Sequence, residues 1–138
     1  MNIKKNIRKI FNIGLYPESF QSRNDLKIWL NENNIKYKSY HIFHNDDWCY
    51  VDEQGYHHVY RDGKELTKGI KAKDVHSYNN GDWQYTDKQG FDHFFRDGIE
   101  LTKDVKAKYA WSFDNGDWEY MDEQGNLHEF DKDNNKIN

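Results

Sequence analysis

The sequence contains one cysteine, one proline and no long run of apolar residues. The single cysteine, Cys49, excludes an intrachain disulfide, and it belongs to no zinc-binding pattern. No segment approaches the roughly 20 apolar residues that a transmembrane helix needs, and basic residues interrupt the apolar residues of positions 1–16 where a signal peptide would have its core. We therefore expect a cytoplasmic protein with no membrane span.

Aliphatic residues are also scarce, but aromatic residues are not. Only 36% of the 138 residues are hydrophobic, whereas 17% are aromatic. Each buried aromatic ring removes roughly 150–250 Å² from water, so stacked rings can supply the burial that aliphatic side chains supply elsewhere. The composition therefore predicts a folded chain, and its length predicts one modest core with a small appendage.

Charge is divided unevenly along the chain. Residues 1–40 carry a net charge of +5 and residues 41–138 a net charge of −9, within a total of −4. This pattern is typical of a basic head on an acidic body, and the acidic body favours a partner with a basic surface.

The strongest pattern is an internal repeat. Residues of one type recur 35 positions apart, within the range of periods in which each copy is one supersecondary unit. They are Trp48, Trp83 and Trp118; Tyr50, Tyr85 and Tyr120; Asp52, Asp87 and Asp122; Gln54, Gln89 and Gln124; Gly55, Gly90 and Gly125; and His58, His93 and His128. The spacing predicts a β-repeat domain over 37–138, with copies at about 37–74, 75–109 and 110–138.

The segment before the repeats, residues 1–36, has helical periodicity. Apolar residues at positions 3, 7, 10 and 11 share one face, which predicts a basic helix over 1–13. A second helix begins either near Pro17 or at a cap provided by Ser22, Asn24 or Asp25. The apolar stripe of this second helix is Leu26, Trp29 and Leu30. The basic residues of the first helix are Lys4, Lys5, Arg8 and Lys9.

The central copy illustrates the β pattern. We predict strands near 75–78, 82–87, 91–96 and 99–102. The Asn80-Gly81 and Asp97-Gly98 pairs are typical of type I′ hairpin turns, which need positive φ at both residues. Asp87 and Gly90 fit the first and fourth positions of a type I turn closed by a left-handed glycine. The predicted fold class is mainly β, with three tandem antiparallel β-hairpin or meander repeats of about 35 residues and a small N-terminal helical cap.

The alternation of residues sorts the strand faces. Trp83 and Tyr85 share one face, which we predict to be inner, and Asp82 and Gln84 share the other, outer face. For the recurrent histidines we favour a structural role, in which each ring is hydrogen-bonded to a neighbouring aspartate or backbone group and packed between rings. Metal ligation is the alternative, but successive copies hold these histidines too far apart to share one ion.

No residue set fits catalysis or a cofactor. Cys49 lacks a base and an orienting group, and the chain has no glycine-rich phosphate loop. Paired aspartates at 46 and 47, 114 and 117, and 131 and 133 lack the twelve-residue calcium loop with its terminal glutamate, so we interpret them as turn and cap residues. We therefore predict a protein that is not an enzyme and that binds no metal and no cofactor.

The hairpin Asn80-Gly81-x-Trp83-x-Tyr85-x-Asp87-x-x-Gly90, with its counterpart from Asn115 to Gly125, resembles the choline- and glucan-binding repeats of cell-wall proteins. It is also similar to WG-type repeats. The first resemblance implies aromatic rings that hold choline or sugar between hairpins in a secreted protein. This chain differs in its longer period and in lacking the Gly-Trp pair that opens those repeats.

These patterns lead to one leading hypothesis and two alternatives. The leading hypothesis is a non-enzymatic binding module for a protein partner. In a sharper version of it, the acidic surface imitates nucleic-acid phosphates and blocks a DNA- or RNA-handling enzyme. Carbohydrate binding is the first alternative, and binding of nucleic acid or a membrane surface through Lys4, Lys5, Arg8 and Lys9 is the second. The partner-binding candidates are Asp47, Asp82, Asp117 and Glu119, and the carbohydrate-binding candidates are Phe43, Tyr78 and Phe113, or Tyr56 and Phe91.

Overall fold

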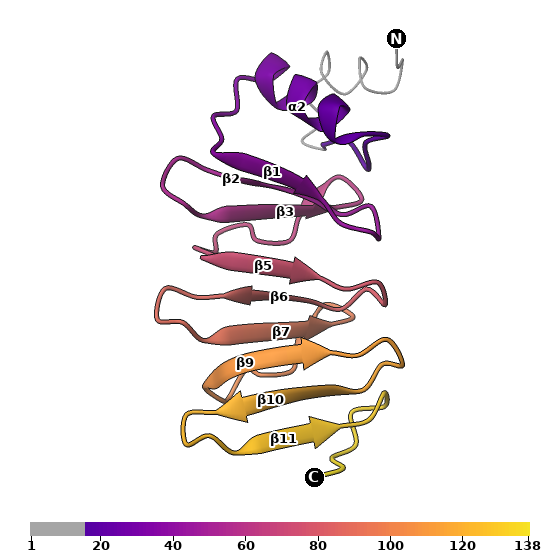
Figure 1. Ribbon diagram of the computed structural model, residues 1–138, viewed down its shortest axis with the longest axis vertical. Coiled ribbons are helices and arrows are strands. Elements are labelled where there is room, and N and C mark those ends of the chain that lie inside the picture. Colours follow the sequence, from indigo (N-terminus) through magenta and orange to yellow (C-terminus); the bar gives the residue numbers. More distant parts are fainter. Residues whose placement is uncertain (1–15) are drawn as a thin grey trace. The chain divides into compact units, whose positions relative to one another are not determined.

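The computed structural model describes residues 16–138 (Figure 1). The helix predicted over 1–13, with Lys4, Lys5, Arg8 and Lys9, lies outside the described residues. Within them the chain is mainly β, with one short helix and two antiparallel sheets, so the predicted fold class is confirmed at that level. The chain divides into two compact units, Met1–Ile70 and Lys71–Asn138.

The first unit contains the helix α2 (Arg23–Glu32) and a four-stranded antiparallel sheet in the order β1-β2-β3-β4. The helix begins at Ser22, one of the predicted caps, whose hydroxyl oxygen accepts a hydrogen bond from the backbone N–H of Asp25 at 3.1 Å. This satisfies one of the free N–H groups of the first helical turn. The strands are β1 (Ser39–Ile42), β2 (Trp48–Val51), β3 (His57–Arg61) and β4 (Lys64–Glu65).

Aromatic rings build the core of this unit. The predicted stripe of α2 is buried, and its Trp29 meets Trp48 edge-on with ring centroids 5.5 Å apart. Trp48 in turn stacks on Tyr60 at 4.3 Å, and its indole N–H donates to the carbonyl of Pro17. The helix therefore covers the face of the sheet that carries these rings, and no polar atom of that indole is left unsatisfied.

The second unit is a seven-stranded antiparallel sheet in the order β11-β10-β9-β7-β6-β5, with β8 paired to β7. The central strands agree with the predicted positions to within one or two residues at most ends. The strands are β5 (Asp74–Ser77), β6 (Trp83–Thr86), β7 (Asp92–Arg96), β8 (Ile99–Glu100), β9 (Ala107–Ser112), β10 (Trp118–Asp122) and β11 (Leu127–Phe130).

Both faces of β6 and β7 are covered, unlike the prediction of an exposed outer face. Trp83 stacks on Phe95 on one face. On the other face, Phe94 stacks on Trp118 of β10 at 5.0 Å, and Gln84 is buried beside it. The core on this second face consists of Tyr78, Phe94, Ala107, Ala110, Trp118 and Tyr120.

The turns show which local predictions were correct. In Asp87–Gly90 the glycine N–H donates to the carbonyl of Asp87 and Gly90 has φ +93°, so the predicted type I turn is confirmed. Asp97 and Gly98 both have positive φ, as a type I′ turn requires. The type I′ prediction for Asn80-Gly81 was wrong, because only the glycine has positive φ and the turn is closed one residue earlier, by a hydrogen bond from Gly81 to Tyr78.

In the part of the chain that the structure describes, no helix has the length and hydrophobicity that a membrane-spanning helix needs.

Candidate functional site

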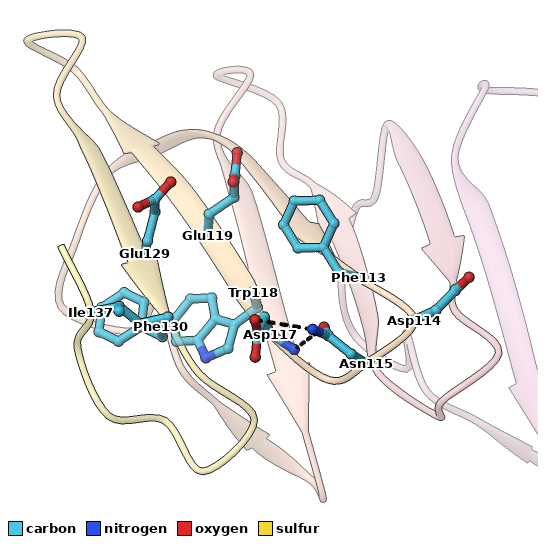
Figure 2. Close-up of a pocket in the computed structure, with 9 residues that line it drawn as sticks. All are labelled: Phe113, Asp114, Asn115, Asp117, Trp118, Glu119, Glu129, Phe130 and Ile137. Atoms are coloured by element: carbon cyan, nitrogen blue, oxygen red, sulfur yellow. Dashed lines mark hydrogen bonds between the residues drawn. The ribbon is translucent and has the colours of Figure 1, made fainter.

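An open pocket of about 570 Å³ in the second unit is lined by the turn between β9 and β10, by residues of β10 and β11, and by the C-terminal segment (Figure 2). Four of its lining residues are acidic and none is lysine or arginine. Two exposed apolar side chains, Phe113 and Ile137, also line it; 43% of the first and 61% of the second are accessible to solvent. The lining residues are Phe113, Asp114, Asn115, Asp117, Trp118, Glu119, Glu129, Phe130 and Ile137.

The turn between β9 and β10 positions Asp117. The Gly116 N–H donates to the carbonyl of Phe113, and the Phe113 N–H donates to the carbonyl of Asp117 at 2.8 Å. The side chain of Asn115 then bridges the turn: its oxygen accepts from the Asp117 N–H and its nitrogen donates to the Asp117 carboxylate at 3.1 Å (Figure 2). Asp117 is therefore held at the lip of the pocket, where it is partly exposed.

Glu119 and Glu129 form the acidic wall. They are directly opposed in the antiparallel pairing of β10 and β11, so their side chains project from the same face (Figure 2). Directly opposed like charges are unfavourable. The Tyr109 hydroxyl donates to Glu119 at 2.5 Å, and this hydrogen bond to an acidic group raises the pKa of Tyr109 to about 12.

Aromatic rings and the C-terminal segment complete the lining. Trp118 stacks on Phe130 at 4.3 Å, and its indole N–H donates to the side-chain oxygen of Asn134. The backbone of Ile137 donates to the carbonyl of Glu129 at 2.8 Å, which places the isoleucine beside the acidic wall. The pocket therefore combines fixed negative charge with apolar surface, an arrangement suited to a cationic group on an apolar stem.

Three of the predicted binding residues meet in this pocket, namely Asp117, Glu119 and Phe113. Glu129 and Ile137 also line the pocket, and neither was predicted as a binding residue from the sequence. A signal for Glu129 was present in the sequence, because position 129 lies 35 residues after Phe94 and so exchanges a buried aromatic residue for a carboxylate.

The prediction that Asp47 and Asp82 lie on an exposed outer face was wrong. Only 4% of Asp47 and 3% of Asp82 is accessible to solvent. Arg61 donates two N–H groups to Asp47, at 3.0 and 2.8 Å, and Arg96 donates two to Asp82, at 2.9 and 2.7 Å. A buried carboxylate needs such a partner, so these two aspartates form ion pairs inside the fold and are not exposed to a binding partner.

The carbohydrate-binding candidates are also separated. Tyr78 is buried, and its hydroxyl donates to the side chain of Gln84 at 2.7 Å, which corrects the prediction that its ring is available to a sugar. Phe43 is partly buried in the first unit and meets the ring of His41 edge-on. Tyr56 and Phe91 are partly buried as well. Of these candidates, Phe113 is the one that lines the pocket.

The recurrent histidines have the predicted structural contacts. Each stacks on a tyrosine, and the Nε2 atoms of His58, His93 and His128 lie 2.8–2.9 Å from an aspartate oxygen. The Nδ1 atoms of His58 and His93 also lie 2.8 Å from Glu65 and Glu100. The three aspartates are Asp52, Asp87 and Asp122.

These contacts shift the pKa values of His58 and His93 and of their aspartate partners. The hydrogen bond to Glu65 raises the pKa of His58, with Asp52 adding to the effect against the cost of burial. Burial lowers the pKa of His93, but hydrogen bonds to its two carboxylates outweigh it, so the net shift is upward. Burial acts against ionisation of Asp52 and Asp87, yet the histidine and backbone N–H groups lower the pKa of each.

No metal-binding arrangement is found in residues 16–138. No group of three or more His, Cys, Asp or Glu side chains there is placed to hold a metal ion. Cys49 is buried and reduced. The pocket lining combines carboxylates with aromatic rings, which suits non-covalent binding of a cation.

Comparison of the chain with models of protein families, with curated proteins and with solved structures found no match.

Proposed function

We propose that this protein is a non-enzymatic binding module that uses the pocket beside β10 and β11 to hold a protein partner with a basic surface. Three tandem β-repeats of about 35 residues are its proposed scaffold, and the cytoplasm is its proposed location. The observation that carries the proposal is the composition of the pocket: four carboxylates, no lysine or arginine, and two exposed apolar side chains.

The opposed pair of Glu119 and Glu129 favours a cationic ligand. Two like charges on neighbouring strands repel each other, and a lysine or arginine placed between them converts that repulsion into two attractions. The exposed Phe113 ring offers such a cation an aromatic surface, and Ile137 offers its stem an apolar one. The net charge of −9 over residues 41–138 also attracts a basic partner before contact.

A sharper form of the proposal is that the partner is an enzyme that handles DNA or RNA. A surface that binds phosphates presents lysines and arginines, which are the groups that this pocket accepts. The protein then acts as an inhibitor by occupying the place of the nucleic acid. In that case, added duplex DNA competes with this protein for the captured enzyme, whereas a partner outside that class is unaffected by DNA.

The experiment is an affinity capture from lysate of the source organism with the full chain, compared with the variant Glu119→Lys/Glu129→Lys. The wild type is expected to retain a partner that the variant loses, and capture is expected to weaken at higher salt. The matched control is Glu123→Lys/Asp104→Lys, which makes the same charge change at two exposed residues outside the pocket. Equal capture by the wild type and the pocket variant would reject the proposed site.

Carbohydrate binding stands as a second proposal because one observation favours it. Phe113 is exposed and lies beside carboxylates, and sugars bind where an aromatic ring adjoins hydrogen-bond acceptors. A glycan array probed with wild type and with Phe113→Ala tests it. Binding that Phe113→Ala abolishes supports a sugar site, and silence of the folded wild type on the array removes this proposal.

A further inference from the structure

Aspartates occur 35 residues apart at the starts of three equivalent strands, and two of them bind an arginine from their own copy. Arg61 holds Asp47 through two N–H groups, and Arg96 holds Asp82 in the same way. In each pair the arginine follows the aspartate by 14 residues. This forked geometry matches the two oxygens of a carboxylate, and lysine cannot reproduce it.

The third aspartate, Asp117, has no such arginine in its own copy. The position 14 residues after it is Asp131, which cannot donate to a carboxylate in its ionised form. The Asp131 side chain also stabilises a turn, where it accepts hydrogen bonds from the backbone N–H groups of Asp133 and Asn135 at 2.9 Å. Those hydrogen bonds, led by that from Asn135, lower the pKa of Asp131 and keep it charged.

The guanidinium of Arg96, which donates to the turn that carries Asp117, already has other partners. Arg96 makes five hydrogen bonds: two to Asp82, one to the carbonyl of Gly116, and two through its remaining nitrogen to Lys132 and Asn134. A guanidinium has five N–H groups, so none is left for Asp117. The hydrogen bond with Asp82 is the main factor that raises the pKa of Arg96, and Asp117 contributes only through space.

Asp117 also differs from the other two aspartates in its surroundings. Asp47 and Asp82 are buried, whereas Asp117 is partly exposed and lines the pocket, with Asn115 as its side-chain partner. Figure 2 shows its carboxylate beside Asn115 and Trp118, while Asp114 points away from this group. In the central copy the Arg96 guanidinium lies 6.0 Å from the Phe94 ring, so packing of this cation near an aromatic ring already occurs in the fold.

We propose that Asp117 binds the guanidinium group of an arginine from the protein partner, in the forked geometry that Arg61 and Arg96 adopt beside Asp47 and Asp82. This inference rests on the proposed function and makes it more specific. The acidic wall of Glu119 and Glu129 attracts any cation, whereas Asp117 selects arginine over lysine. Asp117 then forms its ion pair with an arginine of another protein, whereas Asp47 and Asp82 form theirs with arginines of this chain.

The test uses three synthetic peptides and the ¹⁵N-labelled full chain. The peptides are acetyl-Gly-Arg-Gly-amide, the same peptide with lysine, and the same peptide with citrulline, which keeps the shape of arginine but carries no charge. Binding is followed by NMR through the backbone signals of Asn115 and Asp117 and the indole signal of Trp118. We expect the arginine peptide to bind about tenfold or more tightly than the citrulline peptide, and also more tightly than the lysine peptide.

Two variants locate the effect. Asp117→Asn keeps the size of the side chain and its place in the turn, and it should reduce the affinity for the arginine peptide to that for citrulline. Asp104→Asn removes a charge from an exposed residue outside the pocket and should leave the preference for arginine intact. Equal affinity for the arginine and lysine peptides, no binding of the arginine peptide, or an unchanged preference in Asp117→Asn would each overturn the inference.

The outcome also separates this inference from the proposed function. If Glu119→Lys/Glu129→Lys loses the captured partner but Asp117→Asn retains it at full strength, the pocket binds a basic protein and Asp117 is not its arginine site. If neither variant affects capture, the proposed function fails as well.

Discussion

Glu119 on β10 lies directly opposite Glu129 on β11, in the register that places Gln84 opposite Phe94 at the positions 35 residues earlier. The exchange replaces a buried, neutral pair with a pair of like charges at the wall of an open pocket. Such a pair costs stability in the isolated protein. Its presence therefore links the stability of the last hairpin to the charge of whatever the pocket binds.

Neutralising one member of this pair should stabilise the free protein. We expect Glu129→Gln to raise the free energy of unfolding by about 0.2–1 kcal/mol, because it removes a cross-strand repulsion. Urea denaturation at low salt measures the change, and added salt should shrink it by screening. Glu123→Gln, on an exposed turn, serves as the control and should have little effect. A loss of stability in Glu129→Gln would show that the pair is not repulsive.

Removing Arg96 should cost more stability than removing Arg61. Either substitution leaves a buried aspartate without its arginine, which costs about 3–5 kcal/mol. The Arg96 side chain is the more buried of the two arginines, and it also donates to three groups in the β9–β10 turn and the C-terminal segment. Urea denaturation should therefore show a clearly larger loss for Arg96→Ala than for Arg61→Ala, and adding Asp82→Ala to the former should restore part of it. Equal losses would contradict the role assigned to burial.

Stability should depend on pH in a bell-shaped manner. The raised pKa values of His58 and His93 stabilise the fold fully below the unfolded value of 6.5, and this stabilisation is lost as pH rises through the raised values. The lowered pKa values of Asp52 and Asp87 stabilise it above the unfolded value of 3.8, and this is lost as pH falls through the lowered values. Thermal unfolding midpoints should therefore be highest at about pH 5–6.

A variant isolates the alkaline side of this profile. The double substitution His58→Gln/His93→Gln removes both titrating rings, so the decline of the unfolding midpoint above about pH 6.5 should become shallower. The acidic side should persist in part, because backbone N–H groups still stabilise the charged forms of Asp52 and Asp87. A wild-type profile that is flat from about pH 5 to pH 9 would refute this account.

Two glycines in equivalent turns should respond differently to alanine. Gly81 and Gly116 both have φ between +93° and +94°, so either substitution costs about 1 kcal/mol for the left-handed backbone. A Cβ on Gly81 meets nothing within 4 Å, whereas one on Gly116 comes within 2.9 Å of the Lys132 Cβ. Gly116→Ala should therefore lose more stability in urea denaturation. A greater loss for Gly81→Ala would show that the contact with Lys132 is readily relieved.

Local chemistry could be predicted from the sequence because it depends on neighbouring residues. Ser22 caps α2, and the Asp87–Gly90 turn closes as expected, since both need only a short side chain or a glycine at a defined position. The pairing of each recurrent histidine with the aspartate six residues before it also follows from the hairpin. The tandem-repeat architecture and the two family resemblances stay predictions.

The candidate site was predictable only in part. Asp117, Glu119 and Phe113 could be chosen from their positions in the repeat pattern, but the pattern assigned Asp47 and Asp82 the same exposure as Asp117. The difference arises from residues distant in the sequence. Ser112, which lies 30 residues after Asp82, donates to its carboxylate at 2.7 Å and helps to cover it.

By itself, the sequence determined the β class, the positions of the main turns and the burial of the recurrent tryptophans Trp48, Trp83 and Trp118, because each of these follows from the preferences of a few adjacent residues. The tertiary structure decided which carboxylates are exposed, because that depends on whether an arginine and a further strand cover them. It also decided the pocket: Ile137 reaches the acidic wall only through its backbone hydrogen bond to Glu129, and Trp118 and Phe130 meet only because β10 and β11 pair.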